Sequence, residues 1–301
     1  MAKTKDASER ERFTSPTSAA PVLVGFDGSE GGRDALELAR VLSSIRGTRC
    51  VVASGLTYGP VPVHRALGDE ESAEVEPLFE EARASLEDPE VETHVIGARS
   101  PARMLVECAE RESAGTIVVG SPQRGKIGRA LLGSVAEQVL HHAPCEVVVA
   151  PHGYAAEHHE GYTKIAVAVD GTPESKVALT RAEDLARQAG ATIEILVASD
   201  PVVSGIEAEF PSDAPSSMSD VLEAALGSVD PALAPTGKKV DSGWRQVVRT
   251  IATALAEGCG PDVDLLVAGS RRPMDRFLLG SVTKHLVTEA PCPVLVVSHA
   301  A

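Results

Sequence analysis

Short apolar runs alternate along the chain with longer segments in which apolar residues recur every three or four positions. The short runs are rich in valine and isoleucine, which is typical of strands buried on both faces of a parallel sheet. The longer segments have the period of amphipathic helices. Strand and helix therefore alternate, and this order predicts an α/β fold with a parallel sheet covered by helices on both faces.

The same pattern places the individual elements. Strands are predicted over 21–27, 49–54, 91–96, 117–119 and 147–149, and then over 164–170, 192–198 and, as the least regular, 238–240. Helices are predicted to begin at Glu30, Glu70, Pro101 and Ser134, and again at Pro173, Ser216 and Trp244. A loop is predicted over 55–68, where glycine and proline gather.

One stretch, 116–150, recurs in large part at 264–298. Both copies have Gly-Ser after a strand, Leu-Leu-Gly-Ser-Val at a helix start and Ala-Pro-Cys before a last strand. A period of about 145 residues is the size of a whole domain and too long for a solenoid repeat. The repeat predicts two domains, over 21–150 and 163–301, with a linker over 151–162 and a disordered tail over 1–20.

The loop inside 116–150 has the chemistry of an anion site. Glycines let a backbone approach a phosphate closely, and the free N–H groups of a helix start carry partial positive charge. Ser134 is placed either to cap the helix or to donate to a phosphate oxygen. The alternative is a connecting loop whose glycines only make turns, and the residues alone leave both open. The loop residues in question are Arg124, Gly125, Lys126, Gly128 and Arg129.

Composition limits the classes of partner. The net charge of −15 and the lack of a strongly basic domain argue against a general nucleic-acid binder. No apolar run reaches transmembrane length, so no membrane partner is expected. The five cysteines include no CxxC pair, which predicts reduced thiols and a cytoplasmic location. Cys145 and Cys292 occupy matching places and are expected to be packing residues.

These features, in this order and twice over, resemble a tandem universal stress protein. The resemblance rests on Asp27-Gly28-Ser29, its echo Asp170-Gly171-Thr172, and the shared glycine motifs. It implies two doubly wound, Rossmann-like domains, each with a five-stranded parallel sheet. It also implies that the two halves pair through their last strands as an internal pseudo-dimer. Some members of that family bind ATP.

The resemblance also implies a nucleotide site in the first half. The family pattern is Gly, two residues, Gly, nine residues, then Gly-Ser or Gly-Thr; Gly120 and Gly133-Ser134 match it, while Gln123 replaces the second glycine. The implied cofactor is ATP, with ADP or AMP as alternatives and Mg²⁺ as a companion ion. The implied binding residues are Asp27, Gly28, Ser29, Gly55, Gly120, Ser121, Gln123, Arg124, Gly125, Gly128, Gly133, Ser134 and Val135.

The second half departs further from the pattern. Its loop is two residues shorter, Arg272 stands where a glycine is expected, and Pro273 has no N–H to offer a phosphate. We therefore expect this site to be weakened or silent and the second half to cover the partner sheet's edge. The matching residues are Asp170, Gly269, Arg272, Gly280 and Ser281.

No catalytic constellation and no metal site is predicted. The nucleophile-elbow, HExxH, CxxC and Walker motifs are absent. His141 and His142 suit the negative end of a helix, and His158 and His159 read as solvated loop residues. The leading hypothesis is a nucleotide-binding module used in stress signalling. The alternatives are a slow ATPase or self-phosphorylating protein and a nucleotide-free scaffold; a homodimer of pseudo-dimers is open, and no protein partner is indicated.

Overall fold

The computed structural model describes residues 20–57, 69–98, 100–121, 132–199, 218–241, 253, 255–271 and 281–299. Nearly all of the predicted 1–20 tail and much of the predicted helix from Trp244 lie outside these residues. Within them the chain alternates strand and helix as the apolar pattern predicts.

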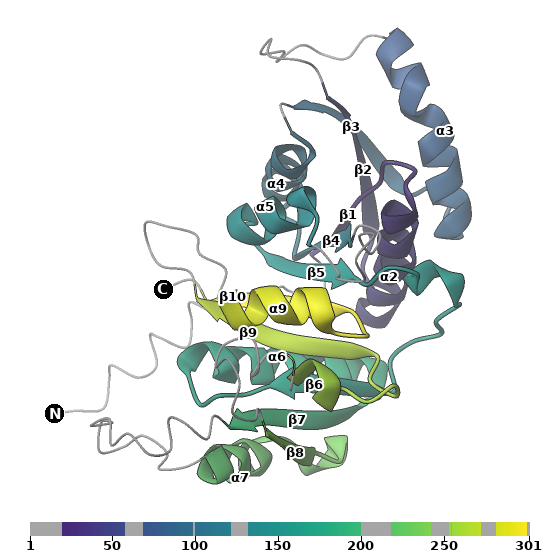
Figure 1. The fold of residues 1–301 in the computed structure, drawn as a ribbon. Helices are drawn as coiled ribbons and strands as arrows, with labels where there is room; N and C mark the ends of the chain where they lie inside the picture. Colours follow the sequence, from purple (N-terminus) through teal and green to yellow (C-terminus); the bar gives the residue numbers. More distant parts are fainter. Residues whose placement is uncertain are drawn as a thin grey trace, which may run out of the picture.

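The strands and helices of the first half occur in the predicted order (Figure 1). They are β1 (Val22–Gly25), α2 (Glu30–Arg46), β2 (Cys50–Thr57), α3 (Asp69–Ser85), β3 (Glu92–Ala98), α4 (Pro101–Glu112), β4 (Thr116–Gly120), α5 (Ser134–His142) and β5 (Glu146–Ala150). A short 3₁₀ helix, η1 (Tyr154–Ala156), follows.

The second half repeats this order. Its elements are β6 (Lys164–Ala168), α6 (Pro173–Ala189), β7 (Thr192–Ser199), α7 (Met218–Ser228), η3 (Pro231–Leu233), β8 (Thr236–Asp241), β9 (Leu265–Arg271), α9 (Ser281–Glu289) and β10 (Val294–His299). The strand predicted at 238–240 is present and longer than expected, because it pairs with β7 along its whole length.

The strands that the structure describes join one ten-stranded sheet, in the order β3-β2-β1-β4-β5-β10-β9-β6-β7-β8. Each half is a parallel five-stranded sheet, and the halves meet where β5 and β10 run antiparallel in the middle of Figure 1. One core cluster packs α2, α3, α6 and α7 on one face of the sheet, and a second packs α4, α5 and α9 on the other. The predicted doubly wound pseudo-dimer is therefore confirmed.

Local chemistry explains where several helices begin. Ser29 accepts a hydrogen bond from Gly32 N at 3.0 Å, and Ser100 accepts one from Arg103 N at 3.3 Å. Both are N-caps, and Pro101 takes the first position of α4 as predicted. Gly47 ends α2 in the left-handed conformation, with φ of 58°.

Two local predictions need correction. β2 runs on to Thr57, so Gly55 lies inside a strand and not in a loop; pairing with β3 as far as Ala98 extends it. The N-cap of α5 is Gly133, with no side-chain cap, so Ser134 is the first helical residue and does not cap the helix.

A buried ion cluster joins the halves. Glu146, at the start of β5, bonds Arg46 Nη2 on α2 and Arg181 Nη2 on α6, each at 3.1 Å. Arg181 Nε and the hydroxyl of Thr116 also bond this carboxylate, and all four side chains are buried. Burial lowers the pKa of the Arg46 guanidinium; Glu146 opposes this effect and Arg181 adds to it. One carboxylate thus holds a cation from each half.

The segment between the halves is fixed on α2. The buried carboxylate of Asp34 accepts Gly153 N at 2.9 Å and Ala155 N at 2.8 Å. Tyr154 stacks on His159 with ring centroids 3.9 Å apart. His158 is exposed as predicted, whereas His159 is partly buried by this stack.

None of the five cysteines forms a disulfide; four are buried and Cys145 is partly buried. Among the helices that the structure describes, none has the length and apolar character needed to cross a membrane.

We predict that Glu146→Gln lowers the free energy of unfolding by about 3–5 kcal/mol, because it leaves two buried guanidinium groups without a counter-charge. Chemical denaturation of the full chain measures this. Glu81→Gln is the matched control, since Glu81 pairs with the half-exposed Arg33 and its loss should change stability little. Equal effects of the two substitutions would contradict this role for Glu146.

A second prediction concerns acid stability. Glu37 accepts hydrogen bonds from Arg40 Nε at 2.8 Å and from His159 N at 3.1 Å. Burial raises the pKa of Glu37, but these hydrogen bonds outweigh it and bring the pKa below its ordinary 4.5. A depressed folded-state pKa stabilises the fold above the unfolded value, and this gain is lost as pH falls through the folded value.

The stability difference between wild type and Glu37→Gln should therefore hold from neutral pH down to about 5 and shrink as pH falls below 4.5, through the folded-state pKa of Glu37. Urea unfolding at a series of pH values measures it. A difference that stays constant or grows in acid would show that the Glu37 carboxylate does not stabilise this contact.

Candidate functional site

The first half has its crevice between β1 and β4. β1 pairs with β2 on one side and with β4 on the other, so the strand order reverses between β1 and β4. In an open parallel sheet, ligands sit at the carboxyl ends of strands at such a switch point. Residues 27–29 follow β1, and Gly120 and Ser121 end and follow β4. The sheet therefore brings these predicted residues together at the carboxyl ends of the two strands.

Asp27 lies at the mouth of this crevice. Its side chain is exposed, and Oδ1 accepts Ser29 N at 3.0 Å. This short-range bond fixes the carboxylate beside the first turn of α2, and it is the one hydrogen bond to Asp27 recorded among the described residues. Gly28 has φ of 75°, which suits glycine in the turn. The second oxygen of Asp27 is thus available to a hydroxyl or amino donor.

The glycine after the fourth strand has a packing role. A Cβ placed on Gly120 would lie 1.8 Å from Gly31 O, because the first turn of α2 touches the end of β4. The second half repeats this contact, where a Cβ on Gly269 would lie 2.5 Å from Glu174 O. The shared glycine is therefore required by helix packing, whatever the half binds.

Two further predicted residues also serve packing. A Cβ on Gly55 would lie 2.3 Å from Met104 Sδ, so its small size makes room for α4. Ser121 is buried, and its N–H donates to Ala150 O at 2.9 Å, which holds the segment after β4 to β5. Gly31 packs against Gly120 and Ser121 and was not among the predicted residues, although the Gly31-Gly32 pair at a helix start is visible in the sequence.

The start of α5 has the character expected of an anion site. Gly133 is its N-cap, with φ of −64° and ψ of 148°, and provides no side-chain acceptor. The caps of α2, α4 and α6 all accept a backbone N–H through a hydroxyl. Within the part of the chain that the structure describes, no side chain therefore caps the first-turn amides of α5. Ser134 and Val135 form this turn, whereas Gln123, Arg124, Gly125 and Gly128 lie outside the described residues.

At the corresponding strand ends of the second half, more of the polar groups are hydrogen-bonded within the protein. Asp170 Oδ1 accepts both Thr172 N at 3.0 Å and Thr172 Oγ1 at 2.6 Å. Thr283 Oγ1, on α9, donates to Gly269 O at 3.2 Å and is buried; its counterpart in α5 is Ala136. Arg272 and Gly280 lie outside the described residues, and of Ser281 only its place at the start of α9 is described.

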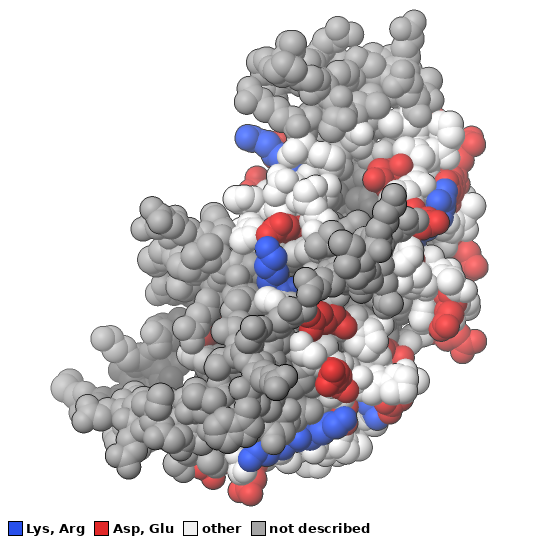
Figure 2. Space-filling view, in the orientation of Figure 1, with Lys and Arg blue, Asp and Glu red and all other residues white. Residues whose placement is uncertain are grey.

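The described part of the surface in Figure 2 shows no extended basic face. Figure 2 shows Lys and Arg side chains interspersed with Asp and Glu over the described part of this side. With a net charge of −15, long-range attraction of an anion is not expected, and an anion site here must rely on local donors.

The fold and the crevice define a doubled α/β protein of the doubly wound class. The universal stress protein family model matches residues 20–151 and 161–298. Since the two matches cover most of the chain, the protein belongs to the universal stress protein family and contains two family units.

Individual relatives agree with this assignment. A universal stress protein of Mycolicibacterium smegmatis is 30% identical over 58% of this chain, and the match spans less than two thirds (62%) of that relative. One of Mycobacterium tuberculosis H37Rv is 25% identical over 91% of this chain and 98% of its own length. The crystal structure of a universal stress protein from Archaeoglobus fulgidus covers 96% of this chain and 100% of its own, with a TM-score of 0.69 and 20% identity, and shows the same fold.

We predict that Gly120→Ala lowers the free energy of unfolding by about 1–3 kcal/mol or more, because the added methyl forces α2 away from β4. Gly161→Ala is the matched control, since a Cβ there meets nothing within 4 Å. Thermal or denaturant unfolding compares the two variants. If Gly120→Ala proves as stable as Gly161→Ala, the close contact of α2 and β4 is not a constraint on this glycine.

Proposed function

We propose that the first half binds ATP, with Mg²⁺ as its companion, and that occupancy serves signalling or regulation under stress. In this proposal the adenosine part lies near Asp27, and the phosphates reach the start of α5. The observation that carries it is the N-terminus of α5, where Gly133 leaves the amides without a side-chain cap beside the crevice. A helix start of this kind offers N–H donors and a favourable dipole to a phosphate.

Asp27 supports the placement of the nucleoside. Its exposed carboxylate is oriented by Ser29 N and stands at the end of β1. A carboxylate is an acceptor for ribose hydroxyls or an amino group, and such charge-assisted hydrogen bonds are stronger than neutral ones. Gly55 and Gly120 then shape the crevice by allowing α4 and α2 to approach the sheet, Gly28 by its positive φ, and Ser121 by its hydrogen bond to Ala150 O.

The second half is proposed to be silent and structural. Thr172 donates to Asp170 twice, and Thr283 reaches over the end of β9. Asp170 Oδ1 thus accepts two hydrogen bonds where Asp27 Oδ1 accepts one, and Ala136 stands in the first half at the position of Thr283. We further propose that the two units are 21–150 and 163–301, and that the segment 151–162, held on α2 by Asp34, keeps them joined.

Two substitutions separate binding from folding. Gly133→Ser introduces a hydroxyl that accepts a first-turn amide of α5, which should leave stability unchanged or raise it by a few tenths of a kcal/mol. The same hydroxyl competes with phosphate for that amide. We expect ATP affinity to fall by about 10-fold or more, while the unfolding midpoint does not fall.

Asp27→Asn tests the other end of the nucleotide. It removes the charge while keeping an acceptor for Ser29 N, and we expect ATP affinity to fall about 10- to 100-fold with little effect on free phosphate. Asp170→Asn is the matched control at the corresponding residue of the second half and should bind ATP like wild type.

Isothermal titration with ATP and Mg²⁺, together with analysis of any nucleotide that copurifies, decides among the alternatives. Binding without product formation supports a binding module. Steady ADP production lost in Gly133→Ser would favour the slow ATPase. Neither heat nor copurified nucleotide would overturn the proposal and leave a nucleotide-free scaffold.

A further inference from the structure

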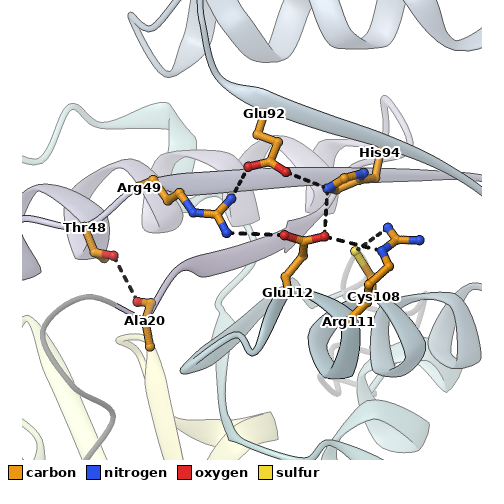
Figure 3. A network of polar contacts seen from close by, with 8 residues as sticks. All are labelled: Ala20, Thr48, Arg49, Glu92, His94, Cys108, Arg111 and Glu112. Atoms are coloured by element: carbon orange, nitrogen blue, oxygen red, sulfur yellow. Dashed lines mark hydrogen bonds and ion pairs between the residues drawn. The ribbon is translucent and has the colours of Figure 1, made fainter.

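A polar cluster lies at the far edge of the first half. Glu92 and His94 project from the same face of β3, two residues apart, and Glu112 is the last residue of α4 (Figure 3). β3 is the outermost strand, and Glu92 is its first residue. The cluster is therefore at the amino ends of the strands, whereas Asp27 and Gly120 lie at the carboxyl ends.

The fold explains how these residues meet. α4 leaves the carboxyl end of β3 and must return to the amino end of β4, so its last turn comes back beside the start of β3. Glu112 thereby reaches residues that lie about 20 positions earlier in the chain, a distance typical of one strand–helix unit. In the sequence, only Glu-x-His on a predicted strand is visible, and this pair does not indicate which residue would be a third ligand.

The ligand atoms already have a metal-like spacing. His94 Nε2 lies 3.1 Å from Glu92 Oε1 and 3.2 Å from Glu112 Oε1, and one ligand atom from each residue lies within 4.8 Å of the others. Ligands held at 2.0–2.2 Å around tetrahedral zinc are about 3.4 Å apart. Two of the three separations thus need little change, and rotation of the half-exposed Glu92 adjusts the third.

Arg49 orients both carboxylates from outside the cluster. It bonds Glu92 Oε2 through Nη1 and Glu112 Oε2 through Nη2, the latter at 3.3 Å. The Oε1 atom of each carboxylate is thereby turned toward His94, as Figure 3 shows. Outer hydrogen bonds of this kind fix ligating carboxylates in metal sites. Arg111 Nε also approaches Glu112 Oε1, at 3.3 Å.

One N–H on Nε2 points at only one of the two facing oxygens, and Glu112 Oε1 also accepts Arg111 Nε. A cation placed between the three atoms is instead bound by all of them at once.

We infer that Glu92, His94 and Glu112 form a binding site for a first-row divalent transition cation, of which Zn²⁺ is the probe. One imidazole nitrogen and two carboxylate oxygens leave a coordination position for water. The two guanidinium groups of Arg49 and Arg111 balance the formal charge of the two carboxylates, so the affinity is moderate, roughly micromolar. The site is independent of nucleotide, and its failure would leave the proposed function untouched.

Titration of the nucleotide-free full chain with ZnCl₂ tests this. Wild type should bind one Zn²⁺ at this site, and Glu92→Gln and His94→Gln should each weaken binding by at least about 10-fold, the effect seen even for outer-shell changes. Glu90→Gln is the matched control, because it removes the same charge from an exposed residue two positions away and should bind Zn²⁺ like wild type.

Co²⁺ gives a second readout. Bound Co²⁺ should show visible absorption without a thiolate charge-transfer band, and the signal should disappear in His94→Gln. A thiolate band would instead place the metal on a cysteine, such as the partly buried Cys145, and overturn the inference. Unchanged zinc affinity in His94→Gln, equal losses in Glu90→Gln and Glu92→Gln, or no zinc binding by wild type would also overturn it.

Discussion

The contact on which the architecture depends is the antiparallel pairing of β5 with β10, secured by the buried carboxylate of Glu146. Glu146 bonds Arg46 from its own half and Arg181 from the other. The intact cluster adds little net free energy of folding, because its charges lose their hydration when they are buried. Separating the halves would leave buried charges without partners, which is costly. The pairing also covers the edge strand that each half would otherwise expose. The second half therefore has a reason to be retained even if it binds nothing.

This constraint separates packing signals from ligand signals. Gly120 and Gly269 recur because α2 and α6 each touch the end of a central strand. Their presence says little about a ligand. The features that differ between halves are more informative: Ser29 leaves Asp27 with one recorded bond where Thr172 makes two to Asp170, and α9 carries Thr283 where α5 has alanine. These differences make the first half the better candidate for a nucleotide site.

The amino-acid pattern predicted the element order, the Ser100-Pro101 helix start and the doubled organisation, because these depend on local periodicity and on a visible repeat. The resemblance added the pairing of the halves, which the structure confirms. The extension of β2 to Thr57 depends on its register with β3, and the hold of Asp34 on residues 153–155 depends on tertiary contact. The grouping of Glu92, His94 and Glu112 likewise required the return of α4, which no local pattern encodes.

The two proposed sites lie at opposite ends of the strands of the first sheet, so the nucleotide proposal can be judged by itself. Its central claim is an asymmetry, with one functional crevice in a chain that contains two family units. The stoichiometry of ATP binding to the full chain, measured by equilibrium dialysis at saturating ATP, tests this claim most directly. The account predicts one ATP per chain. A value of two would contradict the silent second half, and a value of zero would contradict the nucleotide site itself.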